Sequence, residues 1–261
     1  MAVVELQHQV TGEGESVLLL HGLGSRLQDW GLQIPALSEK FRVIACDQRG
    51  HGASPKPAGP YSMSLFAQDA ADLLARLDAG PAHIVGISLG GMVALQLALD
   101  HPELVASITI VNSAPEVTIR TLRQRREFWL RWFILHVLGM KRMGAFVAGK
   151  VFPDEGEEEN RATMAEAWGR NDKRCYIAST RALVGWSVLD RLGEIAVPTL
   201  IVSGSKPYSS SLASESRLAE IAGAEMVVIE QARHAAPIQQ PQEFNALLLE
   251  FLTGLAGNTL D

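Results

Sequence analysis

The chain has 261 residues, a formal net charge of −6 and two cysteines, Cys46 and Cys175. Without a basic tail or domain, this acidic balance argues against a nucleic-acid partner, and two cysteines without metal-ligand spacing form no disulfide framework. No apolar run reaches the roughly 18 residues of a membrane span, and the N-terminus lacks a secretory signal. We therefore expect one large cytoplasmic domain, a monomer or homodimer with no membrane partner.

The first half of the chain alternates between strand and helix patterns. Short apolar or alternating runs predict strands over residues 1–10, 16–21, 41–46, 82–85 and 105–111. Between them, helical patterns cover residues 28–38, 64–79 (with Ser64 as N-cap) and 91–99. Such alternation predicts an α/β fold, in which helices cover both faces of a mostly parallel central sheet.

The alternation stops between residues 115 and 190, which show no convincing strand. Helical patterns cover residues 121–138, 160–169 and 173–183. The acidic run at 154–159 suits a helix N-terminus with Asp154 as its cap. Strand and helix patterns resume at 198–203, 213–222, 225–229 and 241–255. We therefore expect a core of residues 1–114 and 191–261, with residues 115–190 inserted as a helical cap.

Ser88 lies in the sequence Gly86-Ile87-Ser88-Leu89-Gly90, between a predicted strand and a predicted helix. A serine in so sharp a turn points its hydroxyl outward at the N-terminal end of the helix, as in a nucleophile elbow. Side chains at positions 86 and 90 would collide with neighbouring backbone, which explains the two glycines. The alternative is a structural turn rich in glycine and serine, which the strand-and-helix setting disfavours.

A serine nucleophile needs a base, and His234 is the best placed of the seven histidines. It follows the predicted strand 225–229, in a loop that can reach the sheet edge where Ser88 lies. The serine also precedes the histidine in the chain, which is the order that α/β hydrolases require. The alternative is a histidine of a surface loop.

An oxyanion formed at the serine needs backbone donors. We expect these to be the N–H groups of Leu89, at the helix N-terminus, and of Leu23, in a glycine-flanked loop at the same edge. Gly22 of that loop is the candidate for contact with the substrate. His21 is expected to hold the loop through backbone contacts rather than to act in catalysis.

Four motifs, taken in chain order, resemble the α/β-hydrolase superfamily. They are His21-Gly22 after a strand, residues 47–54, residues 86–91 and the loop around His234. The resemblance covers essentially the whole chain and is closest to small capped esterases, 3-oxoadipate enol-lactonase-like hydrolases and carbon–carbon hydrolases. It implies the α/β-hydrolase fold, with residues 115–190 at the place of the cap and a structural role for residues 47–54. It also implies a catalytic triad and an oxyanion hole.

The acid of such a triad is missing from its usual place. The family carries it shortly after the strand that precedes the histidine strand, but Pro207 stands there. Residues 195–214 contain neither Asp nor Glu. In a serine protease triad, neutralising the acid lowers kcat by about 10⁴.

Three explanations stay open. In the first, Glu116 after the strand that precedes the cap supplies the acid, with Asn112 able to orient the imidazole but not to stabilise its charge. In the second, a hydroxyl or a water orients the histidine, and the candidate side chains are Ser205, Tyr208 and Ser209. In the third, the chain is not an efficient hydrolase.

The helical stretch 121–138 carries aromatic side chains and four arginines. Aromatic residues beneath a cap can line an acyl pocket, and Trp129 is the candidate, although the same residues could form the core of the cap itself. The arginines could attract an anionic substrate. We expect them instead on a solvated face, offset by the acidic run 154–159.

Together these residues predict a serine hydrolase of carboxylic esters or lactones, with a small-molecule acyl substrate and no cofactor or metal. Ser88 attacks the carbonyl, His234 transfers the proton, and water releases the acyl group. One alternative is hydrolysis of a carbon–carbon bond in a ring-cleavage dienoate. Another is a hydrolase-fold binding protein, which only Pro207 suggests.

Overall fold

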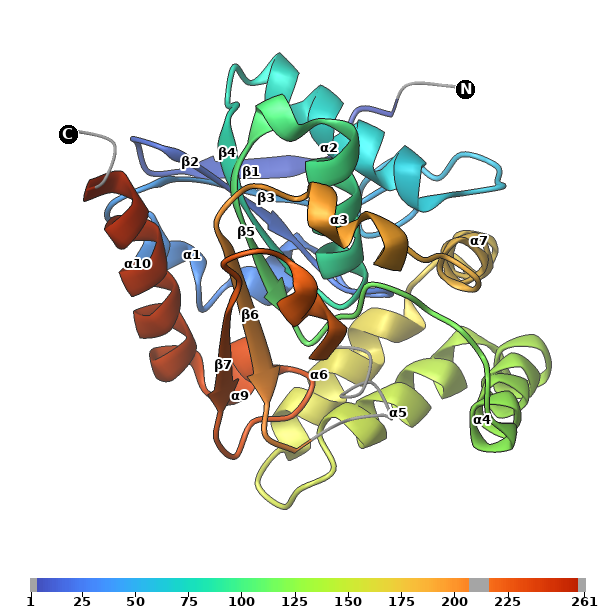
Figure 1. The fold of residues 1–261 in the computed structure, drawn as a ribbon. Coiled ribbons are helices and arrows are strands. Elements are labelled where there is room, and N and C mark those ends of the chain that lie inside the picture. Colours follow the sequence, from blue (N-terminus) through green and yellow to red (C-terminus); the bar gives the residue numbers. More distant parts are fainter. Residues whose placement is uncertain (1–3, 207–215, 258–261) are drawn as a thin grey trace.

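A seven-stranded sheet forms the centre of the molecule (Figure 1). The computed structural model describes residues 4–206 and 216–257. The strands are β1 (His8–Thr11), β2 (Ser16–Leu20), β3 (Arg42–Cys46), β4 (Ala82–Ile87), β5 (Val105–Val111), β6 (Thr199–Gly204) and β7 (Glu225–Ile229). Their order is β1-β3-β2-β4-β5-β6-β7, and only β1 pairs antiparallel with its neighbour. The predicted mostly parallel α/β sheet is confirmed.

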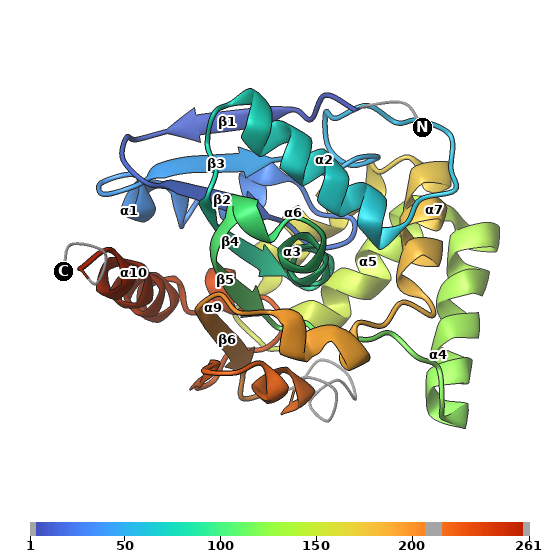
Figure 2. The same ribbon diagram turned by 45° about the horizontal axis from the view of Figure 1, so that its top comes forward.

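Helices cover both faces of this sheet, because alternate strand residues enter two different apolar cores. In β2, Leu18 and Leu20 pack into one core, whereas Val17 and Leu19 pack into the other. The helices α2 (Met63–Arg76) and α3 (Leu89–Asp100) pack into the first core, and α1 (Ile34–Leu37) and α10 (Pro241–Gly257) pack into the second (Figure 2).

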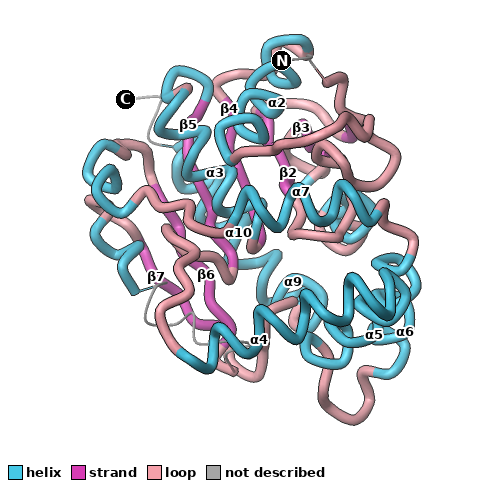
Figure 3. The backbone as a smooth tube through the Cα atoms, turned by 90° about the vertical axis from the view of Figure 1, so that its right-hand side faces the viewer, coloured by secondary structure: helices cyan, strands magenta, loops and turns pink. Residues whose placement is uncertain are grey.

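Between β5 and β6 the chain forms a helical layer beyond the carboxyl ends of the strands (Figure 3). We call residues 115–190 the cap. Its helices are α4 (Leu122–Phe133), the π-helical turn η3 (Ile134–Leu138), α5 (Gly139–Val151), α6 (Glu158–Gly169) and α7 (Lys173–Leu183). The structure describes all of these residues, and their only strand-like pairing is a bridge between Glu116 and Ser187. An apolar cluster around Met143 and Trp168 includes Leu23 and Ala235, so the cap packs on the loops at the sheet edge.

Two helix predictions in the first half of the chain are wrong in detail. The stretch 28–38 is not one helix, because the 3-10 helix η1 (Leu27–Trp30) ends at Gly31 and the four-residue α1 follows. Ser64 is not the N-cap of α2. The hydroxyl of Ser62 accepts the hydrogen bond from the Leu65 N–H at 3.2 Å.

The cap differs from the prediction in two places. Helix α5 was not expected, since three glycines lower its intrinsic helix propensity. The close packing of α6 requires one of these glycines, Gly144, because a Cβ there would lie 2.6 Å from the Ala165 carbonyl oxygen of α6. Asp154 does not cap α6, whose N-cap is Glu157, and it binds Arg233 instead.

Short helices complete the chain. They are η2 (Pro102–Leu104), η4 (Leu189–Glu194), η5 (Ser216–Glu220) and α9 (Ala236–Gln239). Of the predicted helix 213–222, the first three residues lie outside the described ranges, and η5 occupies most of the rest. Across residues 4–206 and 216–257, no helix has both the length and the apolar character that a membrane crossing would need.

Candidate active site

Ser88 occupies a strained turn between β4 and α3. Its backbone has φ 54° and ψ −114°, outside the regions that a serine ordinarily adopts. Neighbouring backbone enforces the turn, because a Cβ at Gly86 would lie 2.2 Å from the Gly90 carbonyl oxygen, and one at Gly90 would lie 2.0 Å from that of Leu20. The collision predicted for side chains at positions 86 and 90 is confirmed. The turn holds Ser88 at the N-terminal end of α3, where the helix dipole favours negative charge.

The loop after β2 lies against this turn. A Cβ at Gly22 would meet the Ser88 Cβ at 3.5 Å, so the loop backbone passes directly beside the serine. His21 Nδ1 donates to the Gly22 carbonyl at 2.8 Å, and its Nε2 accepts from the Gln48 N–H at 3.0 Å. Burial lowers the pKa of His21, which suits this neutral form. His21 therefore holds the backbone on both sides, as expected for a loop support.

The 47–54 loop forms a buried polar layer behind this edge. Asp47 accepts hydrogen bonds from the N–H groups of Leu27 and Ala53, both at 2.7 Å. Arg49 forms a buried ion pair with Asp69 of α2. These contacts satisfy charged groups within the fold, in keeping with the structural role that the resemblance implied.

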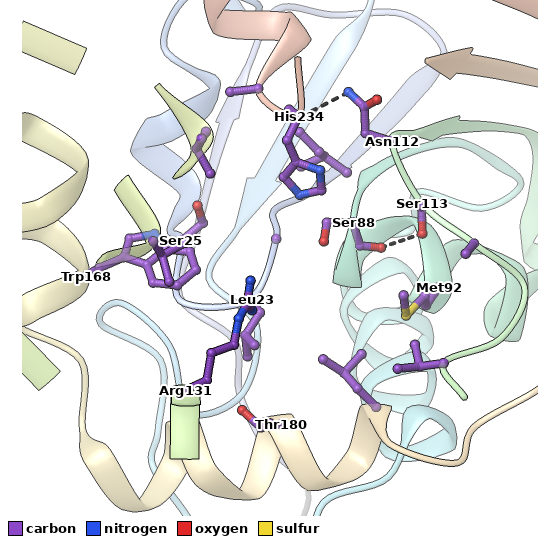
Figure 4. Close-up of a pocket in the computed structure, with 18 of the residues that line it drawn as sticks. Leu23, Ser25, Ser88, Met92, Asn112, Ser113, Arg131, Trp168, Thr180 and His234 are labelled. Atoms are coloured by element: carbon purple, nitrogen blue, oxygen red, sulfur yellow. Dashed lines mark hydrogen bonds between the residues drawn. The ribbon is translucent and has the colours of Figure 1, made fainter. Parts of the chain in front are cut away.

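His234 lies in the loop after β7, and Asn112 holds the backbone of that loop (Figure 4). The Asn112 amide donates to the carbonyls of Arg233 at 3.1 Å and His234 at 3.0 Å. Its Oδ1 accepts from the Gly204 N–H at 2.9 Å. Through these contacts Asn112 binds the backbone on either side of His234 and joins the ends of β5 and β6 to the loop that carries the imidazole. That Asn112 orients the imidazole itself stays a prediction.

The protonation state of His234 suits a base. Burial, and to a smaller extent the positive charge of Arg131, lowers the pKa of the imidazole to about 4. The ring is therefore neutral at pH 7, as a general base must be. Arg131 comes from α4 of the cap, and the expectation that it lies on a solvated face is wrong, because it lines the cavity.

The cap is joined to the histidine loop by ion pairs and hydrogen bonds. The Arg233 guanidinium binds the Asp154 carboxylate through two hydrogen bonds. Its Nη2 donates to one oxygen at 3.0 Å and its Nε donates to the other at 3.1 Å. Gln239 accepts from the Arg233 N–H at 2.8 Å and donates to Glu157 at 2.6 Å. The residue before His234 is thus fixed by the loop that leads into α6.

A cavity of about 650 Å³ lies between the sheet edge and the cap. Figure 4 shows the side chains of Ser88, His234 and Arg131 projecting into it. Gly22 and Leu23 line it as well, and so do apolar cap residues such as Phe128 and Trp132. Leu89 lies beneath, fully buried at the first turn of α3. The volume and the mainly apolar wall are typical of a small-molecule site.

Trp129 does not belong to this cavity. Its side chain is 64% exposed and is absent from the cavity wall. The prediction of a substrate contact is corrected by the phase of α4, which turns Phe128 and Trp132 inward and Trp129 outward.

The described carboxylates of the cavity wall are paired with basic side chains. Glu116 binds Arg120 at 2.9 Å, Glu127 binds Lys150 at 2.6 Å, and Asp29 lies 3.8 Å from Arg26. After β6, the hydroxyl of Ser205 accepts from the Gln231 N–H at 3.0 Å. The position where the triad acid is expected, Pro207, lies outside the described residues. So do Tyr208 and Ser209, two of the hydroxyl groups that could replace the acid.

Metal ligation finds no support among the described side chains. Within residues 4–206 and 216–257, no group of three or more His, Cys, Asp and Glu side chains could hold an ion. Both cysteines are buried and unpaired with each other.

Comparison with known proteins agrees with this geometry. A family profile described as alpha/beta hydrolase fold matches residues 15–241. RutD of Caulobacter segnis, named as a carbamate hydrolase, is 31% identical over 253 residues, with 92% of each chain covered. The 3-oxoadipate enol-lactonase 2 of Acinetobacter baylyi is 28% identical and covers 93% of this chain and 91% of its own. The enol-lactonase structure from Burkholderia xenovorans LB400 superposes with a TM-score of 0.87 at 28% identity, covering 96% and 97% of the two chains.

Proposed function

Because the chain belongs to the α/β hydrolase fold family, we propose that it is a serine hydrolase which cleaves a carboxylic ester or lactone through an acyl-enzyme on Ser88. One observation carries the proposal. Ser88 is held at φ 54° at the N-terminal end of α3, on the wall of the cavity that His234 also lines. Strain of this kind is stored at sites where a side chain must be presented in one orientation.

In the proposed mechanism, the Ser88 Oγ attacks the carbonyl carbon while His234 takes its proton. The N–H groups of Leu23 and Leu89 donate to the oxyanion, and the dipole of α3 favours its charge. The carbon–oxygen bond to the leaving group breaks, and His234 returns the proton to the departing oxygen. Water then attacks the acyl-enzyme by the same steps and restores Ser88.

Glu116 is the proposed candidate for the acid behind His234, in competition with an arrangement that has no carboxylate. It lies on the cavity wall close to the end of β5, and Arg120 binds its carboxylate. If it orients the imidazole, Glu116→Gln lowers kcat by up to about 10⁴. An unchanged kcat would remove Glu116 from the triad, and Arg120→Gln controls for loss of the ion pair alone.

The central test is covalent labelling. A fluorophosphonate probe should label the wild-type protein once, at Ser88, and should fail to label Ser88→Ala. His234→Gln should fold normally and react far more slowly. Failure of the wild type to react would overturn the proposal and favour a hydrolase-fold binding protein.

The class of acyl substrate can be identified by comparing hydrolysis rates on a small panel of compounds. Simple p-nitrophenyl esters, lactones and a phenyl carbamate all present an sp² carbonyl to Ser88. The similarity to enol-lactonases supports lactones, and the similarity to RutD supports including the carbamate. Slow turnover of every oxygen ester would favour the carbon–carbon hydrolase alternative.

A further inference from the structure

The outer face of α4 carries apolar side chains that nothing in the described fold covers. Leu122, Trp129, Leu130 and Phe133 are 79%, 64%, 47% and 54% exposed, and Val137 of η3 is 64% exposed. We call these five residues the α4 outer face. Six of the eleven large apolar side chains exposed in the described residues lie between positions 122 and 138. Isolated apolar side chains on a surface are ordinary, but a concentration of them marks an interaction surface.

The spacing of these residues gives the helix two opposite faces. Leu122, Trp129 and Phe133 follow each other by seven and four residues, so they share one side of the helix. Gln124, Glu127, Phe128 and Arg131 lie on the other side and line the cavity. No residue of α4 is fully buried, and Figures 1 and 2 show the helix at the periphery of the molecule. The outer face is therefore presented outward by a helix whose inner face belongs to the site.

Basic side chains are concentrated in the segment of the chain that carries the outer face. Arg123, Arg125 and Arg126 are exposed on the same helix, and Lys141 and Arg142 are exposed on α5. Residues 120–150 contain eight of the 23 lysines and arginines but only one of the 29 acidic residues. A chain of net charge −6 thus carries a strongly basic segment at a cluster of exposed apolar side chains.

This combination disfavours a second copy of the chain as the occupant. A two-fold symmetric pair would place the same patch on both sides, and the arginines that flank it would face each other. It fits a lipid surface, where tryptophan and phenylalanine insert at the headgroup level and arginines meet anionic headgroups.

We propose that the α4 outer face is a peripheral docking surface for an anionic lipid membrane. The helix lies in the plane of the interface, with Trp129 and Phe133 inserted and Arg125 and Arg126 at the headgroups. This departs from the sequence-based expectation of no membrane partner, which rested on the lack of a spanning segment. The proposal stands on the cap surface alone and does not depend on the reaction at Ser88.

The test is co-sedimentation with vesicles of phosphatidylcholine that contain or lack 30% phosphatidylglycerol. Wild-type protein should bind the anionic vesicles, bind neutral ones at least tenfold more weakly, and dissociate at high salt. The emission of Trp129 should shift to the blue on binding, and Trp129→Phe should lose that shift.

Paired variants separate the contribution of the arginines to membrane binding from that of the apolar side chains. Each basic side chain near an anionic surface changes partitioning by about fivefold, so Arg125→Glu with Arg126→Glu should weaken binding by at least that factor for each position. Trp129→Ser with Phe133→Ser should weaken it about tenfold or more. Leu32→Ser and Arg76→Glu, at exposed positions outside α4, are the matched controls and should bind as wild type.

Three results would overturn the proposal. They are no binding of the wild type to anionic vesicles, equal binding by the α4 variants, and a dimer that the same variants dissociate. All substitutions are at exposed positions, so unchanged melting temperatures should confirm that the variants are folded.

Discussion

Asn112 joins the ends of β5, β6 and the histidine loop through a single side chain, and Asn112→Ala removes that junction. Three hydrogen bonds are lost, two from its amide to the carbonyls of Arg233 and His234 and one from the Gly204 N–H to its Oδ1. Asn112 is 9% exposed and Gly204 is buried, so little water can replace these contacts.

The magnitude follows from the groups left without partners. An unsatisfied buried donor or acceptor costs about 1–3 kcal/mol, but the cavity beside Asn112 admits some water to the carbonyls. Asn112 also has φ 43°, which asparagine tolerates better than alanine. We therefore expect a loss of about 2–4 kcal/mol in the free energy of unfolding. At about 2 °C per kcal/mol for a chain of this size, the melting temperature should fall by roughly 4–8 °C.

The same change should act on catalysis through the position of His234. A displacement of about 1 Å in a catalytic group can cost on the order of 10² in rate, so kcat should fall by ten- to a hundredfold. The KM for a small ester should stay the same, since the apolar wall is untouched. Stopped-flow acylation with a p-nitrophenyl ester and urea unfolding measure the two effects on one preparation.

Asn245→Ala is the matched control. Asn245 of α10 also donates its amide to a backbone carbonyl, that of Leu32 at 2.9 Å, but neither residue lines the cavity. It should lose stability without losing kcat. Asn112→Asp, which keeps an acceptor for Gly204 and loses the donor, should resemble Asn112→Ala in kcat. If Asn112→Ala kept kcat within twofold, Asn112 would not be a positioning residue for the histidine.

Three further predictions test the packing and the electrostatics. Gly90→Ala places a Cβ 2.0 Å from a β2 carbonyl oxygen and should give no folded protein, whereas Gly149→Ala, with open space around it, should raise the free energy of unfolding by about 0.5–1 kcal/mol in thermal melts. The pKa values of His51 and His234 are lowered to about 3 and about 4, so between those values and 6.5 the unfolded chain binds more protons than the native one. Stability should therefore fall as the pH drops from 6.5 to 4.5, by on the order of 2 kcal/mol for each histidine, and urea midpoints that do not change with pH would contradict this. Arg131→Gln removes a positive charge that lowers the pKa of His234, so the acid limb of kcat/KM should move from about pH 4 to higher pH, and a limb that stays in place would exclude this coupling.

The elbow at Ser88 could be predicted from sequence because its causes are local. Gly86 and Gly90 are required by atoms within the same turn and the adjacent strand, and the strand and helix around them have clear patterns. The roles of Asn112 and Arg131 could not be predicted in the same way. They depend on which strand ends and which cap helix lie close together across the cavity. Such contacts between distant segments leave no local pattern in the sequence.

The cap helices show where a local signal was present and was misread. In α4, the positions that line the cavity are spaced by three, one, three and one residues, as one side of a helix requires. Assigning a helical phase from that spacing would have placed Phe128 inward and Trp129 outward. Helix α5 was missed for the opposite reason, since Gly144 weakens the helix locally but allows α6 to approach it closely.

The ion pair between Asp154 and Arg233 connects the cap to the segment that carries His234. If the cap moves when a substrate enters, Asp154 moves with it. Arg233 precedes His234 in the chain, so this motion either breaks the ion pair or pulls on the segment that carries the base. An open state would thus release one constraint on the proposed base His234, and closing around a substrate would restore it. Closure would then be part of assembling the site, and water that enters an open, empty site would meet an incompletely positioned histidine.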